Sequence, residues 1–243
     1  MEIITLDLQF EQIRHDFIPL RHEIEKRLID SDLLFKINEI RRYFFKAFKL
    51  IKQESNFIES KELIDQGIEH RSNIVENQLA IGLILSIELP ILAFYEYRKN
   101  NYTNALNLLN QAMFNEDYLI INGFDLLQYR KVELFINIAK VYLKVGCCEK
   151  ASIEISKAIC GLVKFVPNEE YNLVDHSYFT NDTFSFVLNT IDKLDQFYSN
   201  FEKKVMSNVA ESNILVLDKP ILLSRELYTN LLNRCHYLNS NSK

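Results

Sequence analysis

Glycine and proline are scarce in this chain, and tryptophan is absent. The 243 residues include Gly 5 and Pro 4, whereas average usage of about 7% Gly and 5% Pro corresponds to roughly 17 and 12 residues at this length. Tight turns and β-hairpins depend on these two residues. A chain that contains so few of them has few such turns, so the composition predicts an all-α protein built from long helices. Hydrophobic residues make up 48% of the chain and are sufficient for a large core.

Cysteine is also scarce, and positive charge is not in excess. The four cysteines include no C-x-x-C pair, and two of them, Cys147 and Cys148, are adjacent. This pattern excludes a disulfide framework and predicts reduced thiols in the cytoplasm. The net charge of −5 argues against a general nucleic-acid binder.

A clean membrane-spanning run is missing as well. The beginning of the chain, MEIITLDLQF, is acidic and does not resemble a secretory signal. The longest apolar run, residues 79–95, contains Glu88 and Pro90 and is shorter than the roughly 20 apolar residues that a span requires. We therefore expect two buried helices here, one over about 74–87 and a second that begins at Pro90, and no membrane partner.

Three segments of the chain share one pattern of large and small residues with a spacing of about 45 residues, and a fixed period of this kind is typical of stacked helical hairpins. The third copy contains Phe135, Ile138, Ala139, Tyr142, Gly146, Cys148, Ala151, Ile155 and Ala158. The second contains Leu89, Leu92, Ala93, Tyr102, Ala105, Leu109 and Ala112. The first contains Phe44, Ala47, Phe48, Ile51, Phe57, Ser60, Ile64 and Gly67.

Residues 135–159, FINIAKVYLKVGCCEKASIEISKAI, resemble a tetratricopeptide repeat. The resemblance implies antiparallel helical hairpins in a right-handed superhelical stack, with small residues where the two helices of a hairpin cross closely. The period of about 45 residues is longer than the roughly 34 residues of that family. The second copy departs from the family pattern at Glu96, which replaces an aromatic residue, and at Asn100, which replaces a turn glycine.

The chain is predicted to consist of a repeat body and a helical cap. The repeat body covers residues 1–170, and the cap covers residues 171–243, with the polar segment 167–183 at the boundary. Two further helices are expected over 182–211 and 220–237, because a repeat stack needs to cover its last open face. Helices are expected in about 70–80% of all residues, against a third in an average protein.

The resemblance also implies a binding site. In tetratricopeptide proteins the first helices of successive repeats line a concave groove, and some members use Lys, Asn and Arg there to hold an acidic peptide. The chain is therefore expected to be a non-catalytic scaffold or adaptor that binds an acidic segment of another protein and needs no cofactor. Lys140 and Lys144 are expected to be exposed. The predicted contact residues are Arg42, Phe45, Lys46, Lys49, Phe94, Tyr97, Arg98, Asn137, Lys140 and Lys144.

Two alternative functions rest on other residues. A metalloprotein or enzyme could use Glu11, His15 and His22, which share one face of a helix, or the segment Glu169–His176. A nucleic-acid-associated regulator could use the basic face of residues 36–52. The chain contains no phosphate-binding loop, nucleophile elbow or HExxH motif, so an enzyme is not the favoured interpretation.

Overall fold

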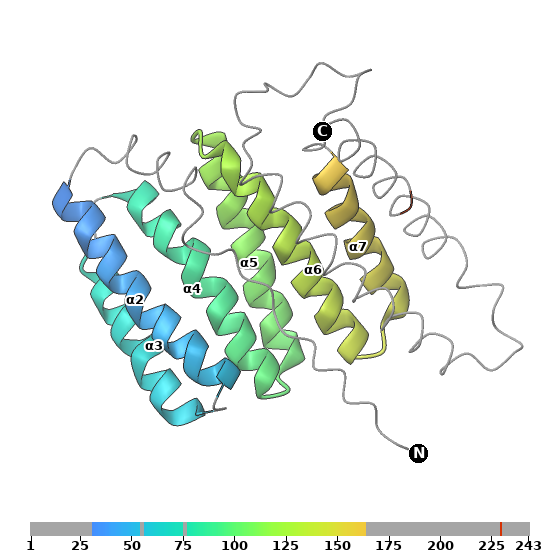
Figure 1. The fold of residues 1–243 in the computed structure, drawn as a ribbon, viewed down its shortest axis with the longest axis horizontal. Coiled ribbons are helices and arrows are strands. Elements are labelled where there is room, and N and C mark those ends of the chain that lie inside the picture. The colour runs from blue at the N-terminus through green and yellow to red at the C-terminus, as the bar shows by residue number, and fades with distance from the viewer. Residues whose placement is uncertain (1–30, 54–55, 75–76, 164–228, 230–243) are drawn as a thin grey trace, which may run out of the picture. The chain divides into compact units, whose positions relative to one another are not determined.

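The computed structural model describes residues 31–53, 56–74, 77–163 and 229 (Figure 1). Within these residues the fold is all-α, as predicted, with six α-helices, one short 3-10 helix and no strand. The elements are α2 (Ser31–Gln53), α3 (Phe57–Ser72), α4 (Gln78–Arg98), α5 (Tyr102–Ile121), η1 (Asp125–Leu127), α6 (Gln128–Lys144) and α7 (Cys148–Val163).

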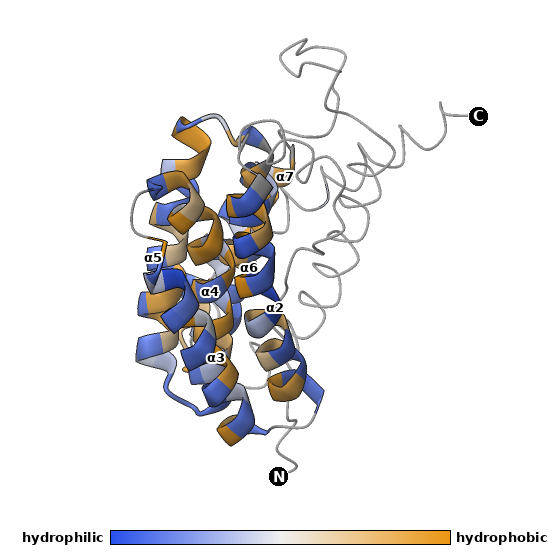
Figure 2. Cartoon of the chain, turned by 90° about the vertical axis from the view of Figure 1, so that its left-hand side faces the viewer, coloured by the Kyte–Doolittle hydropathy of each residue, from blue (hydrophilic) through white to orange (hydrophobic). Residues whose placement is uncertain are grey.

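The described helices belong to two compact units that divide within α6, between Val141 and Tyr142. In the unit that contains residues 31–141, α2 packs against α3 and α4, α4 packs against α3 and α5, and α5 packs against η1. Figure 2 shows α5 and α2 on opposite sides of α4. In the other unit, α7 buries one face, which carries Ala151, Ser152, Ile155, Ala158, Ile159 and Leu162.

The small residues of the repeat pattern lie at close packing positions in the second helix of each pair. The same position of the repeat is occupied by Ser60 in α3, Ala105 in α5 and Ala151 in α7. None of these three residues is exposed. Gly67 shows why such a slot excludes a larger side chain, since a Cβ atom there would lie 2.8 Å from Cζ of Phe44. The other buried residues at these slots are Ile64, Leu109, Ala112, Ile155 and Ala158.

The turns that follow α4 and α6 have the same backbone conformation. Asn100 and Gly146 both adopt the left-handed region, with φ values of 62° and 81°. The N–H of Asn100 donates to the carbonyl of Tyr97 over 3.0 Å, and the N–H of Gly146 donates to the carbonyl of Leu143 over 3.1 Å. A turn was expected at Asn100, which replaces a turn glycine of the family pattern, and the structure confirms it.

The hydrogen bonds around these turns repeat as well. Asn101 donates to the Glu96 carbonyl and Cys147 donates to the Tyr142 carbonyl, each over 2.9 Å. With the bonds of the preceding residues they form the Schellman motif that ends many helices. The second helices also begin alike, with bonds from Ser60, Ala105 and Ala151 to the carbonyls of Asn56, Asn101 and Cys147. The period of the sequence is therefore also a period of the backbone.

The predicted helix break at Pro90 is wrong. Residues 78–98 form one continuous helix with Pro90 inside it, although an interior proline costs about 3 kcal/mol. The helix is apolar around most of its circumference, as is typical of a helix buried on all sides. It is also the one described helix that is long and apolar enough to cross a membrane, but 72% of its most apolar window is buried inside the protein. Burial of this surface outweighs the local cost of the proline.

Several predictions fall outside the described residues. They concern the domain boundary at 170–171, the polar segment 167–183, and the helices expected over 182–211 and 220–237.

Candidate partner-binding surface

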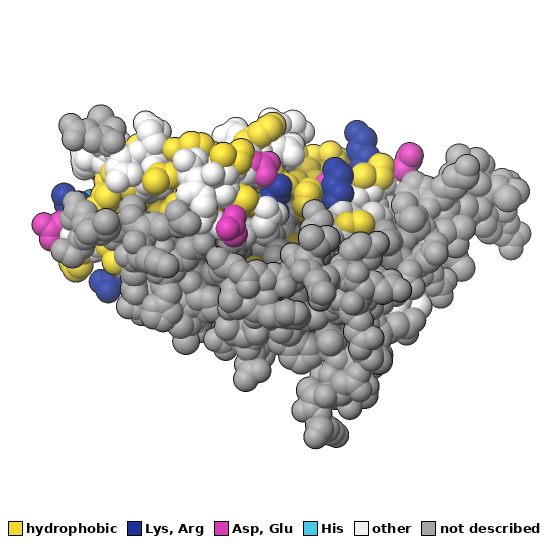
Figure 3. Space-filling model, turned by 90° about the horizontal axis from the view of Figure 1, so that it is seen from above, with side chains coloured by type: hydrophobic (Ala, Val, Ile, Leu, Met, Phe, Trp, Pro, Cys, Tyr) yellow, Lys and Arg dark blue, Asp and Glu magenta, His cyan; other side chains and the backbone are white. Residues whose placement is uncertain are grey.

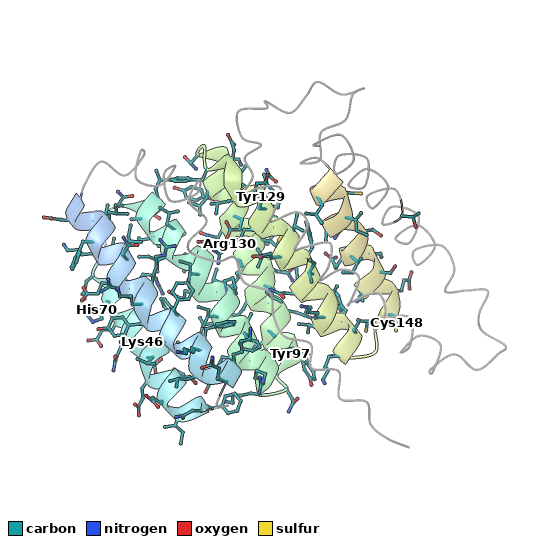
Figure 4. All side chains as sticks on the ribbon, viewed as in Figure 1. Lys46, His70, Tyr97, Tyr129, Arg130 and Cys148 are labelled. Atoms are coloured by element: carbon teal, nitrogen blue, oxygen red, sulfur yellow. The ribbon has the colours of Figure 1, made fainter. Side chains whose placement is uncertain are left out.

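Helix α2 separates apolar and basic residues onto opposite faces. Its buried face carries Ile37, Ile40, Phe44, Ala47 and Ile51. Arg42, Lys46 and Lys49 recur at the i, i+4 and i+7 positions on the opposite face, and all three are exposed. We call these three residues the α2 basic row; Figure 4 labels Lys46 within it.

The α2 basic row has no acidic partners among the residues that the structure describes. Two of the other exposed cations on the described helices do have such partners, since Lys61 pairs with Asp65 and Lys157 Nζ lies 2.7 Å from Glu154 Oε1. Within the described part of the chain, the row therefore presents three exposed cations whose charge is not neutralised by a carboxylate.

An aromatic pair lies near the C-terminal ends of α2 and α4. The rings of Phe48 and Phe94 have centroids 5.2 Å apart. Lys52 Nζ lies 6.0 Å from the Phe48 centroid, and the Arg98 guanidinium lies 5.8 Å from the Phe94 centroid. Each cation is at a distance where it is attracted to the face of its ring. Lys52 at this end of α2 and Arg98 at the end of α4 therefore add two further positive charges beyond the basic row.

The structure distributes the ten predicted contact residues over three classes of exposure. Arg42, Lys46, Lys49 and Lys144 are exposed, as a binding role requires. Phe45 and Arg98 are half-buried. The remaining four, Phe94, Tyr97, Asn137 and Lys140, are buried.

The expected exposure of Lys140 is wrong, since only 6% of this residue is accessible. The reason is that α6 buries every residue from 136 to 141 and therefore has no solvent face in this part. Phe94 and Tyr97 are buried for a different reason, because their rings pack against Phe48 and Tyr102. A partner could reach none of these side chains without displacing part of the protein.

Sequence reasoning missed two ion pairs between helices, each with a buried carboxylate. Arg71 at the end of α3 donates from Nε and Nη2 to the two carboxylate oxygens of Glu88 on α4, over 2.6 and 3.0 Å. Glu116 on α5 lies 3.2 Å from Nε of Arg130 on α6, and both residues are almost completely buried; Figure 4 labels Arg130. The position of Glu88 inside an apolar run was the one feature of the sequence that indicated such a pair, because a buried carboxylate requires a partner.

Burial governs the protonation of these groups. Loss of solvent raises the pKa of Glu116 to about 8, although Arg130 opposes this shift. Burial likewise raises the pKa of Glu88, and the hydrogen bonds from Arg71 oppose it. Burial, with a smaller contribution from Arg130, lowers the pKa of Arg41 to about 10. Such shifts also occur in structural ion pairs, so they do not by themselves indicate catalysis.

Metal and thiol chemistry find little support in the described residues. Among residues 31–53, 56–74 and 77–163 no three His, Cys, Asp or Glu side chains are grouped as metal ligands. Glu11, His15, His22 and the segment 169–176 lie outside the described residues. Cys147 is exposed and Cys148 is half-buried.

Comparison of the chain with known proteins identifies no family for it. No protein-family model, curated protein or solved structure matches this chain.

Proposed function

We propose that the chain is a non-catalytic, tetratricopeptide-like scaffold that binds an acidic segment of another protein along the α2 basic row. The observation that carries this proposal is the presence of three exposed cations on one helix face that have no acidic partner among the described residues. Like charges at i and i+4 destabilise a helix by about 0.2–0.5 kcal/mol per pair. A row that is unfavourable in the isolated protein becomes favourable once carboxylates lie opposite it.

The surroundings of the row support an anionic partner with apolar residues. Phe35 lies on the same face, about two turns before Arg42, and is 65% exposed. Lys52 and Arg98 add positive charge near the other end. Aromatic and arginine side chains contribute strongly to interface energies. The favoured ligand is therefore an acidic peptide that places one apolar side chain near Phe35.

The dimensions of the row define the ligand further. From Arg42 to Lys49 the helix rises about 10 Å at 1.5 Å per residue. Three residues of an extended chain cover about the same distance at 3.3–3.6 Å each. Closely spaced carboxylates in an extended peptide, or carboxylates at i, i+4 and i+7 of a helical one, match this spacing.

The scaffold part of the proposal rests on the repeated backbone. The matching turns at Asn100 and Gly146, and the small buried residues at Ser60, Ala105 and Ala151, follow the period of the sequence. Repeat proteins of helical hairpins present their helices side by side and use the resulting surfaces for binding.

Fluorescence anisotropy with a labelled peptide rich in Glu and containing one Phe tests the proposal. The variant Lys46→Glu/Lys49→Glu is expected to bind at least tenfold more weakly, and wild-type binding should weaken as salt rises. The control Lys36→Glu/Lys61→Glu changes the net charge equally, at exposed positions outside the row. Equal losses in both double variants would show a non-specific charge effect and contradict the assignment.

A single-stranded oligonucleotide of matched charge provides the second arm of this experiment. The same three cations could contact phosphates, whose binding decreases steeply with salt. If the oligonucleotide bound more tightly than the peptide, and lost this affinity in Lys46→Glu/Lys49→Glu, the surface would be a nucleic-acid site instead.

A further inference from the structure

Helices α2 and α3 carry rows of opposite charge on their exposed faces. On α3, Glu62 and Glu69 are exposed and stand seven residues apart, which is also the separation of Arg42 and Lys49 in the α2 basic row. At this separation two side chains lie on one face of a helix. Neither glutamate has a cationic partner among the residues that the structure describes. We call Glu62 and Glu69 the α3 acidic row.

The contacts between α2 and α3 show that the two helices are antiparallel. Phe44 of α2 lies against Gly67 of α3, where a Cβ atom would be 2.8 Å from the ring. Tyr43, one residue earlier on α2, stacks on His70, three residues later on α3, with ring centroids 5.1 Å apart. Positions along one helix therefore fall as positions along the other rise.

The contact between Phe44 and Gly67 also places the charges of the two rows at matching levels. Arg42 and Glu69 each lie two residues from this contact, toward the same end of the hairpin. Lys49 and Glu62 each lie five residues from it, toward the other end. No ion pair joins these four residues within the described part of the chain.

Both rows point away from α4. Helix α2 contacts α4 through Phe48, and α3 contacts it through Phe57 and Arg71. With about 100° of rotation per residue, each row lies on the far side of its helix from these contacts. Helices α2 and α3 lie side by side to the left of α4 in Figure 1, and this side faces the viewer in Figure 2. Figure 3 shows side chains of both charges at the left-hand edge of the described surface, where these two helices lie.

We propose that this outer face of the α2–α3 hairpin pairs with the same face of a second copy of the chain, about a two-fold axis parallel to the helices. The rotation places α2 of one copy against α3 of the other and leaves levels along the helices unchanged. Arg42 then meets Glu69 of the second copy, and Lys49 meets Glu62 of the second copy. The symmetry repeats each pair, so the interface contains four ion pairs and the assembly closes at two copies.

A second copy fits the face better than other occupants do. An acidic peptide or a nucleic acid contacts the α2 basic row and leaves the α3 acidic row without a partner, and a basic partner does the reverse. The two-fold related copy presents both signs in the opposite order and neutralises both rows. Phe35 and Ile58, which are 65% and 79% exposed, add apolar area toward the two ends of the face.

This inference rests on the proposed function, because the α2 basic row serves both. An acidic peptide and the α3 acidic row of a second copy require the same cations. The dimer and the peptide complex therefore exclude one another, and self-association sets the number of rows that are accessible to a partner protein.

The expected dimer is weak. Helix α3 has 16 residues and is about 24 Å long at 1.5 Å per residue, and neighbouring helices lie about 10 Å apart. The paired face then measures about 24 by 20 Å, which is smaller than the roughly 800 Å² per partner of a standard interface. We expect a dissociation constant on the order of 10 µM, and it should rise with salt because exposed ion pairs are screened.

Sedimentation velocity of the full chain from about 1 to about 200 µM, a range that brackets this constant, tests the proposal. In low salt the wild type should convert from monomer to dimer, and Glu62→Lys/Glu69→Lys should associate at least tenfold more weakly. The control Asp125→Lys/Glu149→Lys changes the net charge equally at exposed residues outside the face, and it should dimerise like the wild type. Circular dichroism of each variant should match the wild type, because the altered side chains are exposed.

A mixing experiment tests the two-fold arrangement. The variant Arg42→Glu/Lys49→Glu carries two acidic rows and Glu62→Lys/Glu69→Lys carries two basic rows, so each should be monomeric alone. An equal mixture should form a heterodimer, because all four pairs then join opposite charges. A wild type that stays monomeric at all concentrations, or equal association of the wild type and Glu62→Lys/Glu69→Lys, would overturn the proposal. An equal loss in the control would do the same, and wild-type dimers without heterodimers in the mixture would overturn the two-fold pairing.

Peptide binding distinguishes this inference from the proposed function. The variant Glu62→Lys/Glu69→Lys keeps the α2 basic row, so it should bind the labelled Glu-rich peptide at least as tightly as the wild type. Peptide binding by a wild type that never dimerises would overturn the dimer alone. Dimerisation of a wild type that does not bind the peptide would overturn the proposed function alone.

Discussion

Asn100 and Gly146 are 46 residues apart in the chain and have the same left-handed backbone conformation, with φ values of 62° and 81°. Asparagine tolerates this conformation better than most residues, and glycine tolerates it best. The same backbone conformation is thus adopted by two different residue types in the two turns. The pair provides a controlled comparison of what each choice contributes to stability.

Asn100→Gly is expected to stabilise the protein by about 0.5 kcal/mol, and Gly146→Ala is expected to destabilise it by about 1 kcal/mol, because a left-handed residue with a Cβ is strained. No atom lies within 4 Å of a Cβ placed at Gly146, so steric contact adds nothing to this cost. Urea denaturation measures both changes. If Asn100→Gly and Gly146→Ala changed the free energy of unfolding in the same direction, the two turns would not have equivalent backbones.

Ser60→Ala is expected to stabilise the protein by about 1 kcal/mol. The Ser60 hydroxyl is buried and has no hydrogen-bond partner among the described residues, and removal of such a group relieves its desolvation cost. Alanine already occupies this slot at Ala105 and Ala151. Thermal denaturation monitored by circular dichroism would show a higher midpoint; a lower one would mean that the hydroxyl makes a favourable interaction.

Gly67→Ala is expected to destabilise the protein by about 1–3 kcal/mol, because the added methyl group overpacks the core. The new Cβ would lie 2.8 Å from Cζ of Phe44. Phe44→Leu removes the ring that causes this contact, so the double variant should lose less stability than the sum of the two single variants. Additive losses would show that the helices do not approach each other so closely at Gly67.

Glu116→Gln is expected to stabilise the protein increasingly as the pH rises. The pKa of Glu116 is raised to about 8 from an ordinary value of 4.5, so the folded state favours the protonated carboxyl. Its contribution to stability is fully present below pH 4.5 and is lost as the pH approaches 8. The difference in unfolding free energy between Gln variant and wild type should grow across this window and then level off. A difference that shrank instead would mean that Glu116 is ionised and held by Arg130.

Arg71→Met is expected to cost about 3 kcal/mol, because it leaves the carboxylate of Glu88 buried without its partner. Arg71 makes both observed hydrogen bonds to that carboxylate. The double variant Arg71→Met/Glu88→Gln should recover most of the lost stability, since burial of a neutral amide costs less free energy than burial of a carboxylate. A double-mutant cycle in urea measures the coupling; a coupling energy near zero would contradict the pairing.

Much of the fold was predictable because it depends on local pattern. The basic face expected over residues 36–52 is the exposed face of α2. Asn56 precedes α3 and is of a residue type that favours helix N-caps, and its side chain accepts a bond from the Glu59 N–H. Small residues at a fixed spacing predicted the close packing positions at Ser60 and Gly67. In each case the residues that determine the structure are neighbours in the chain.

The errors have a common physical origin in tertiary packing. Pro90 would end an isolated helix, but burial of α4 by α2, α3 and α5 outweighs this local preference. Lys140 was expected in solvent because lysine usually is, whereas α6 has no solvent face at that point. The pairing of Glu116 with Arg130 was not predictable, since the two lie on different helices and no sequence pattern relates them.

The burial of α4 on nearly all sides has a consequence for synthesis of the protein. Its helical partners α2 and α3 precede it in the chain, and α5 follows it. As the chain leaves the ribosome, the first two can cover α4 at once, but the surface that belongs to α5 stays uncovered until some 20 further residues have been added. At about 5–20 residues per second, this interval lasts on the order of seconds. During it the nascent chain presents its most apolar segment to chaperones and to other unfinished chains.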